Sequence, residues 1–307
     1  MNKVVIVGCG NVGMAYAYAL VNQKTYVSDL VLIDINVDKT IGEVMDLNHC
    51  LPYSPSKMNI RVGNYQECKD AKIVVITAGA NQKIGETRMD LIYKNADIFK
   101  SIITEIKKSG FDGIYLIATN PLDVMTYLTL KYSVSSYEKV IGTGAALDTA
   151  RLRYLLGEEL NICPKDIDAY VIGEHGDTEF IPWSNANVGF KKITDYLKED
   201  KLNEIEDKVR NSAYEVIERK GATCYGIGTC MVRITNAILE DKKVILAVSS
   251  YDKKNDVCIS TPTTVGSMGV SRKIYIPLSK EEEEKLQNSV DYIKEAINKL
   301  KERDNKI

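Results

Sequence analysis

The sequence predicts an α/β protein in which a doubly wound parallel sheet is followed by an α+β domain. Short apolar runs alternate with segments of helical length through the first half of the chain, and this pattern changes after residue 142. A β-α-β-α order is typical of a parallel sheet with helices on both faces. The 307 residues are enough for two domains, each with its own core, and we place them at 1–142 and 143–307.

The strands of the first domain are expected in continuous β-branched runs, which is the pattern of strands buried on both faces. These runs are Val4–Val7, Leu30–Ile33, Ile73–Thr77, Ile114–Thr119 and Val140–Gly142. Between them, Asn11–Asn22 and Arg88–Lys108 have lengths that predict helices. This alternation predicts a parallel sheet but not the order of its strands.

The second domain is expected to begin with a helix over Asp148–Leu160 and to continue as mixed strands and turns from Ala169 to Ser279. The last segment is the clearest helix, because its apolar residues recur at spacings of four and three. They are Leu286, Val290, Ile293, Ile297 and Leu300. Ser279 and Glu282 predict a capping box at its start. This stripe is expected to pack on the body of the protein, although a partner-binding helix has the same pattern.

The balance of charges gives no reason to expect nucleic acid or a membrane surface as a partner, since the formal net charge is −2. The seven cysteines are scattered and none forms a C-x-x-C pair, which favours reduced thiols in a cytoplasmic protein. With only two histidines, ordinary zinc-ligand spacing is missing, so no metal is expected. No apolar run approaches the ~20 residues of a transmembrane helix. The run near the N-terminus is too short for a signal peptide.

A G-x-G-x-x-G motif, formed by Gly8, Gly10 and Gly13, comes directly after the first expected strand and opens a helix. In that context the motif predicts a Rossmann-type dinucleotide site, where the N-terminus of the helix holds the pyrophosphate. A structural turn without a ligand is the alternative for the glycines alone. Asp34 ends the second strand, where a carboxylate accepts hydrogen bonds from the adenosine ribose and repels a 2′-phosphate. The sequence therefore favours NAD over NADP.

Four further polar segments extend this pattern along the chain. They are Asn81–Arg88, Ala118–Pro121, Leu147–Arg151 and Ile172–Asp177. In this order and at these separations the chain resembles the L-lactate/malate dehydrogenase family over essentially its whole length, and within it the bacterial L-lactate members. The resemblance implies reversible hydride transfer between NADH and pyruvate, giving L-lactate and NAD+ in fermentative metabolism.

The resemblance also implies two catalytic residues, His175 and Asp148, and a substrate-binding residue, Arg151. Arg88 would be the third catalytic residue. His175 would give a proton to the carbonyl oxygen of pyruvate, and Asp148 would favour and orient the imidazolium. Arg151 follows Asp148 by three residues, so both project from one helix face, and it would bind the substrate carboxylate through two hydrogen bonds. Each residue has a structural alternative, namely a packed or surface histidine, a helix N-cap and a solvated arginine.

The glycine-containing segment that ends at Arg88 is expected to close over the substrate as a lid. By resemblance, Arg88 would stabilise negative charge on the carbonyl oxygen, and Asn120 would help to position His175 and the nicotinamide. Gln82 stands where malate-specific members carry an arginine, so a second substrate carboxylate would be left unpaired. Pyruvate is therefore favoured over oxaloacetate, with Thr223 beside the small end of the substrate. A malate dehydrogenase and a catalytically silent NAD-binding protein are the rival interpretations.

Further contacts are implied by the resemblance alone. Cofactor contacts would come from Gly8, Gly10, Asn11, Val12, Gly13, Asp34, Thr77, Ala78, Gly79, Asn120, Thr143 and Ile227. The assembly would be a homotetramer. Relatives that fructose bisphosphate activates bind it with an arginine and a histidine. Arg153 keeps the first, but Asp168 replaces the second and would repel a phosphate, so we expect weak or absent activation.

Overall fold

The computed structural model describes residues 2–80 and 87–304. Within them, a nine-stranded sheet runs through the molecule in the order β12-β11-β10-β6-β5-β4-β1-β2-β3. Every pairing among β1 to β6 is parallel, as predicted for the first domain. These six strands are β1 (Lys3–Val7), β2 (Asp29–Ile33), β3 (Asn59–Val62), β4 (Ile73–Ile76), β5 (Ile114–Ile117) and β6 (Val140–Gly142). The chain reverses its winding between β1 and β4, and a crevice at the carboxyl ends of such strands is where ligands bind in this architecture.

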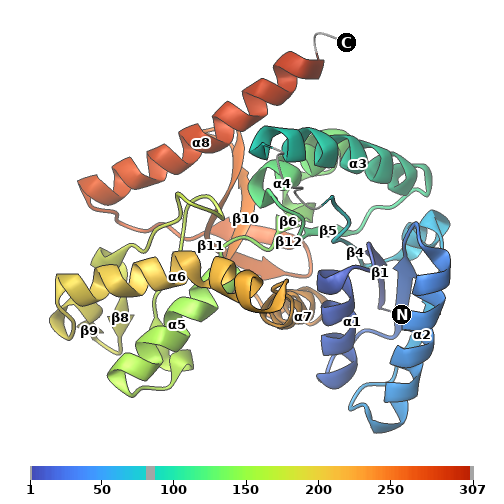
Figure 1. The fold of residues 1–307 in the computed structure, drawn as a ribbon, viewed down its shortest axis with the longest axis horizontal. Coiled ribbons are helices and arrows are strands. Elements are labelled where there is room, and N and C mark those ends of the chain that lie inside the picture. Colours follow the sequence, from blue (N-terminus) through green and yellow to red (C-terminus); the bar gives the residue numbers. More distant parts are fainter. Residues whose placement is uncertain (1, 81–86, 305–307) are drawn as a thin grey trace.

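Helices cover both faces of the parallel strands (Figure 1). They are α1 (Asn11–Asn22), α2 (Val37–Cys50), α3 (Arg88–Lys108) and α4 (Leu122–Ser133). The predicted bounds of α1 and α3 are confirmed. On β1, Val4 and Ile6 belong to the core shared with α1, whereas Val5 and Val7 belong to the core shared with α3 and α4. This alternation explains the unbroken apolar runs, because successive strand side chains enter opposite cores.

The second half adds antiparallel strands and four long helices. The antiparallel strands are β10 (Val244–Asp252), β11 (Val257–Gly266) and β12 (Gly269–Lys273), and they extend the main sheet where Ser249 of β10 pairs with Gly142 of β6. A small separate sheet contains β7 (Ile167–Asp168), β8 (Asn187–Val188) and β9 (Lys191–Lys192). The helices are α5 (Ala146–Leu160), α6 (Glu199–Lys220), α7 (Tyr225–Leu239) and α8 (Lys280–Asp304).

The expectation of mixed strands and turns between Ala169 and Ser279 is wrong over α6 and α7. Helix α6 buries only a narrow stripe that includes Leu202, Ile205 and Val209, and its remaining surface is strongly charged. Helix α7 has the opposite character, because it is apolar over much of its circumference and contains two glycines. Both helices nevertheless bury residues at helical spacings, such as Met231, Thr235 and Ile238 of α7, so the sequence did contain a helical pattern that the expectation of strands and turns overlooked.

The predicted terminal helix is confirmed in α8. Its stripe is buried against the body of the protein, including Val290, Ile293 and Ile297. The capping box is formed, since the main-chain N–H of Ser279 donates to Glu282 at 2.8 Å and the N–H of Glu282 donates to the Ser279 hydroxyl at 3.3 Å. Within residues 2–80 and 87–304, no helix combines the length and apolar character needed to cross a membrane.

The two halves of the chain meet where α7 lies against α1 (Figure 1). Gly228 of α7 approaches the main chain of Ala15 so closely that a Cβ atom would stand 2.8 Å from the Ala15 carbonyl oxygen. Next to this contact, the hydroxyl groups of Tyr16 and Thr235 are hydrogen-bonded at 2.6 Å in a fully buried position. The glycine-motif helix and a helix of the second half are therefore held together directly.

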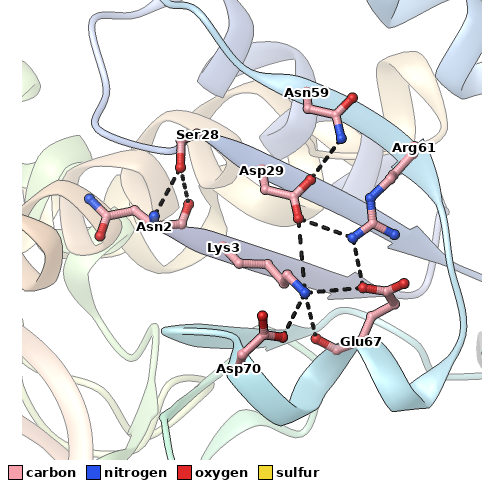
Figure 2. Close-up of polar contacts among 8 residues, drawn as sticks. All are labelled: Asn2, Lys3, Ser28, Asp29, Asn59, Arg61, Glu67 and Asp70. Atoms are coloured by element: carbon pink, nitrogen blue, oxygen red, sulfur yellow. Dashed lines mark hydrogen bonds and ion pairs between the residues drawn. The ribbon is translucent and has the colours of Figure 1, made fainter.

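At the amino ends of β1 and β2 lies a set of ion pairs that we call the amino-end cluster, formed by Lys3, Asp29, Arg61, Glu67 and Asp70 (Figure 2). Buried Lys3 lies 2.6 Å from Asp70 and 3.1 Å from Glu67. Arg61 reaches Glu67 at 2.6 Å and Asp29 at 3.0 Å. The hydrogen bond from Arg61 lowers the pKa of Glu67 to about 2. Each acid in this cluster therefore contacts a cation directly.

Candidate active site

The glycine motif forms the turn between β1 and α1. Gly8 has a φ of +105°, and a Cβ there would collide with the main chain of Ala78. A Cβ at Gly10 would meet open space among the described atoms, so a ligand can approach this backbone. Gly10 is the N-cap of α1 and supplies no side-chain hydrogen bond to the first turn. The amide groups of that turn are therefore placed to bind a phosphate.

Asp34 lies at the carboxyl end of β2, beside this turn. Its Oδ2 accepts a hydrogen bond from the main-chain N–H of Cys9 at 2.6 Å, and its Oδ1 accepts one from Asn36 at 2.9 Å. These contacts fix the carboxylate, and each oxygen keeps a further lone pair for a ribose hydroxyl. The glycine turn and Asp34 together fit the pyrophosphate and adenosine ribose of NAD.

The ends of β4 and β5 are joined by a buried amide that the sequence interpretation missed. Asn95 of α3 accepts a hydrogen bond from the main-chain N–H of Ala80 and donates one to the carbonyl oxygen of Asn120, both at 2.8 Å. The hydroxyl of Thr119 adds a bond to the carbonyl of Ala78 at 2.8 Å. Residues 78–80 and Asn120 therefore lie side by side at the carboxyl ends of β4 and β5. An asparagine inside a helix gives no local signal of such a task.

His175, Asp148 and Arg151 meet at the same end of the sheet. Asp148 is only 2% exposed, in the first turn of α5, where Ala145 and not Asp148 is the N-cap. Its Oδ2 lies 2.7 Å from Nδ1 of His175, and its Oδ1 lies 2.6 Å from Nη1 of Arg151. The predicted common face of Asp148 and Arg151 is thus observed. Because Nδ1 is engaged with Asp148, Nε2 is the nitrogen that His175 can offer to a substrate.

The charges of this group determine its protonation. Burial alone would lower the pKa of His175, but the adjacent carboxylate of Asp148 outweighs burial and raises that pKa to about 9. Burial likewise opposes ionisation of Asp148, but the charges of His175 and Arg151 hold its pKa below the usual range. At neutral pH the structure therefore pairs an imidazolium with a carboxylate, which is the state of a proton donor.

A second acid, Glu179, completes what we call the carboxyl-end cluster, formed by Asp148, Arg151, His175 and Glu179. Glu179 is 6% exposed, and burial together with the charge of Asp148 raises its pKa well above the usual range. Ligand atoms of Asp148, His175 and Glu179 lie within 4.8 Å of one another. A metal could take three such groups, but both Asp148 oxygens already accept bonds from Arg151 and His175. The sequence-based expectation of no metal remains a prediction.

The main chain of the loop that carries His175 is held by Asp123 of α4, a residue that the sequence interpretation also missed. Asp123 is 2% exposed, its Oδ2 accepts the main-chain N–H of His175 at 2.8 Å, and its Oδ1 accepts the hydroxyl of Ser249 at 2.5 Å. Burial raises the pKa of Asp123 to about 6. A cavity of about 200 Å³, lined by His175, Leu122 and Ile293 among others, adjoins this point. Its lining comes from α3, α4, α8 and the histidine loop, and it includes neither Asp148 nor Arg151.

Comparisons with known proteins agree with this geometry. The family model described as lactate/malate dehydrogenase, NAD binding domain, matches residues 2–142, and the model of the alpha/beta C-terminal domain of that family matches residues 145–304. The chain belongs to the lactate/malate dehydrogenase family. It is 49% identical to an L-lactate dehydrogenase of Halalkalibacterium halodurans over 299 residues, which cover 96% of both chains.

Solved structures of this family also superpose on the chain. A lactate dehydrogenase from a Medee basin deep-sea metagenome library is 47% identical with a TM-score of 0.94, covering 97% of this chain and 98% of the other. The minor L-lactate dehydrogenase from Enterococcus mundtii, in its ligands-bound form, is 41% identical with a TM-score of 0.95 and the same coverage. The Rossmann-type fold class and an NAD cofactor are therefore established for this member of the family.

The remaining predicted site residues of this lactate/malate dehydrogenase family member are only partly placed. Thr143 is buried directly after β6, and Thr223 is half-buried just before α7. Ile227 of α7 and Val12 of α1 pack against the same core. Gln82 and the side chain of Arg88 lie outside the described residues, as does most of the expected lid. Their roles therefore stay predictions from the resemblance.

Proposed function

We infer that the chain catalyses reversible hydride transfer between NADH and pyruvate, which gives L-lactate and NAD+. The observation that carries this proposal is the contact of His175 with Asp148, 2.7 Å apart, next to Arg151 at the carboxyl edge of a dinucleotide-binding sheet. When a carbonyl group accepts a hydride, its oxygen needs a proton donor. A substrate carboxylate needs a cation to bind it in the site. Pyruvate has both groups. The names of the relatives support the same reaction.

In the proposed reaction, His175 moves the proton. The bound NADH supplies a hydride to the carbonyl carbon of pyruvate. Nε2 of the His175 imidazolium donates a proton to the carbonyl oxygen, so that the hydroxyl of lactate forms and the ring becomes neutral. Asp148 holds Nδ1, orients the ring and stabilises its positive charge before the transfer. In the reverse direction, neutral His175 takes the hydroxyl proton of lactate.

Arg151 is proposed to bind the substrate carboxylate. In this structure its Nη1 contacts Asp148, and the planar guanidinium has further N–H groups that match a carboxylate in a two-pronged geometry. By resemblance, Arg88 stabilises the charge on the carbonyl oxygen, and Asn120 and Thr223 border the substrate. Gln82 is proposed to exclude oxaloacetate, because a neutral amide leaves a second buried carboxylate unpaired.

The test compares kcat/KM for pyruvate and oxaloacetate, each with NADH and with NADPH. We expect pyruvate with NADH to be preferred, and Gln82→Arg to shift the preference toward oxaloacetate because it supplies a partner for the second carboxylate. A wild-type preference for oxaloacetate would make the chain a malate dehydrogenase. No turnover of either acid would leave a silent NAD-binding protein.

Several coarser features accompany this proposal. We propose a division into residues 1–142, which bind NAD, and 143–307, which carry the catalytic residues. A homotetramer is proposed from the resemblance, and sedimentation at enzyme-assay concentration tests it. A cytoplasmic location is proposed from the scattered cysteines, all seven of which are free thiols in the structure. Absence of nucleic-acid and membrane partners remains a prediction from the charge balance.

Weak or absent activation by fructose bisphosphate is also proposed. Arg153 donates from Nε to the main-chain oxygen of Ala169 at 3.0 Å, and its guanidinium lies 4.7 Å from the centre of the Tyr170 ring. Exposed Asp168 is next to this position and places a negative charge there. Addition of millimolar fructose bisphosphate is expected to leave KM for pyruvate nearly unchanged. A large fall in KM would contradict this expectation.

A further inference from the structure

Glu179 is a buried acid that the proposed mechanism does not use. It is 6% exposed, and one of its carboxyl oxygens lies within 4.8 Å of an oxygen of Asp148 and of a ring nitrogen of His175. Two carboxyl groups can share a hydrogen bond only when one of them carries a proton, because ionised carboxylates are acceptors alone. Two ionised carboxylates this close in a buried position repel each other, so one of the two acids keeps a proton, and the surrounding charges decide which.

Asp148 is the acid that keeps its charge. Arg151 and His175 both donate to its oxygens, at 2.6 and 2.7 Å, and donors of positive charge stabilise the ionised form. In the part of the chain that the structure describes, no ion pair reaches the carboxyl of Glu179. The proton of the pair therefore belongs on Glu179.

The other groups around Glu179 reinforce this assignment. From α6, Arg210 approaches only the main-chain oxygen of Glu179, at 3.4 Å, and its charge is paired with Glu206 and Asp207 at 3.1 Å each. From α4, Asp123 adds a negative charge near His175, which opposes ionisation of a further acid. The charges of His175 and Arg151 favour ionisation of Glu179, but burial and the charge of Asp148 outweigh them, so its pKa stays well above the usual range.

Two more groups complete the surroundings of the pair. Glu174, in the same loop as His175, accepts hydrogen bonds from the main chain and hydroxyl of Thr178. From α7, the thiol of Cys230 lies near Asp148, and burial raises its pKa to about 12, so that it is neutral. A neutral thiol is only a weak donor, so the protonated carboxyl of Glu179 would be the stronger third donor to Asp148.

We propose that Glu179 is a positioning residue that stays protonated and donates its O–H to Asp148, fixing that carboxylate and limiting how tightly its charge holds the proton on His175. This inference rests on the proposed function, since it deepens the role of the same histidine. A donor to Asp148 draws off part of its negative charge, which the imidazolium would otherwise receive in full. Glu179 thereby makes His175 a better proton donor to pyruvate and allows the neutral ring that lactate oxidation requires.

The test compares Glu179→Gln with Glu179→Leu in pH profiles of kcat/KM, for pyruvate reduction and for lactate oxidation. The amide of Gln donates a hydrogen bond as the protonated acid does. In both profiles, the limb (the part of the curve where kcat/KM changes with the protonation of His175) is therefore expected to stay at its wild-type pH. Leu removes the donor, and we expect the limb of lactate oxidation to move up by about one pH unit. Near neutral pH, lactate oxidation then falls about tenfold, while binding of pyruvate is kept.

Two outcomes would overturn the proposal. If Glu179 were ionised, Glu179→Gln would remove a negative charge near His175 and move the limb down by about one unit or more. If neither variant moved the limb, Glu179 would have no effect on His175. Both outcomes are read from variants of an active enzyme, whereas a wild-type chain that turns over no pyruvate would remove the proposed function instead.

Infrared difference spectroscopy gives a readout that does not need the Leu variant to fold. Wild-type protein at mildly alkaline pH is expected to show the stretching band of a protonated carboxyl, and Glu179→Gln is expected to lack it. Asp123 does not interfere there, because burial raises its pKa only to about 6. Absence of this band from the wild-type spectrum would show that the carboxyl is ionised and would end the proposal.

Discussion

The amino-end cluster lies at the amino ends of β1 and β2, and the carboxyl-end cluster lies in the segments that follow the carboxyl end of β6 in the same sheet; the two hold their protons in different ways. In the first, hydrogen bonds from cations lower the pKa of Glu67 and of Asp70 (Figure 2). In the second, the pKa of His175 rises to about 9, because the charge of Asp148 outweighs burial. Burial and the charge of Asp148 raise the pKa of Glu179. One cluster is therefore permanently charged, and the other contains protons that can move.

The difference comes from the distribution of contacts and not from the number of charges. The amino-end cluster has three acids for two cations, yet each acid contacts a cation within 3.1 Å. At the carboxyl end, Asp148 takes both Arg151 and His175, and Glu179 is left to hold a proton. A buried acid without its own cation is thus a marker of a proton-transfer site, whereas a matched network indicates a structural one.

The largest effect is expected from Asp148→Asn, which breaks the carboxyl-end cluster. Loss of the charge lowers the pKa of His175 and loosens the ring, so kcat/KM for pyruvate reduction should fall by about a thousandfold. Steady-state kinetics across pH measure this, with the exposed Asp166→Asn as a matched control. If kcat/KM of the variant changed at the same pH as in the wild type, Asp148 would have no influence on the pKa of His175.

Lys3→Met breaks the amino-end cluster instead. The variant removes the cation of exposed Asp70 and one of the two cations of Glu67, which keeps Arg61, and we expect the free energy of unfolding to fall by about 2 kcal/mol. Because Lys3 lies at the far end of the strands, kcat and KM should be unchanged. Urea denaturation and kinetics of the same preparation measure both, with exposed Lys72→Met as the control. A lower kcat under conditions in which the variant is fully folded would contradict the view that the amino-end cluster affects stability and not catalysis.

A smaller effect is expected from pH alone. Pyruvate reduction needs the imidazolium, so its kcat/KM should fall about tenfold per unit once pH rises above the His175 pKa of about 9. Lactate oxidation needs the neutral ring and should rise over the same range. Initial rates in both directions measure this, with buffers matched in ionic strength. Parallel curves for the two directions would show that another group limits the rate.

The smallest effect is expected in acid, at the amino-end cluster. The pKa of Glu67 is about 2 in the folded chain, below its unfolded value of ~4.3, so its contribution is full above the unfolded pKa. That contribution is lost as pH falls from the unfolded value toward the folded one. Glu67→Gln should therefore flatten this part of the curve of unfolding free energy against pH. An identical slope in the variant would mean that other carboxyls determine acid stability.

Much of the fold could be predicted because its signals are local. Asn11–Asn22 and Arg88–Lys108 lie between strands of unbroken apolar residues, and the Ser279–Glu282 capping box depends on residues three apart. The common face of Asp148 and Arg151 also follows from a spacing of three on a helix. Such features need no knowledge of what packs against them.

The remainder depends on contacts between distant parts of the chain. Strand β3 was missed because Asn59–Val62 is short and has only one fully buried residue. Asn95 and Asp123 form their hydrogen bonds with loops that are distant in the sequence and that lie beside α3 and α4 only in the fold. Glu179 follows His175 by four residues, but its neutrality depends on Asp148, which is far away in the chain. No local pattern records such neighbours.

The close approach of α7 to α1 limits how freely the halves of this enzyme could be exchanged. Gly228 leaves no room for a side chain against Ala15, so each helix is shaped to the other's backbone. A chimera that takes its dinucleotide-binding half from a distant dehydrogenase would inherit a new α1 facing the old α7. Such a chimera should therefore fold only when α7 (residues 225–239) is taken from the same protein as the first half.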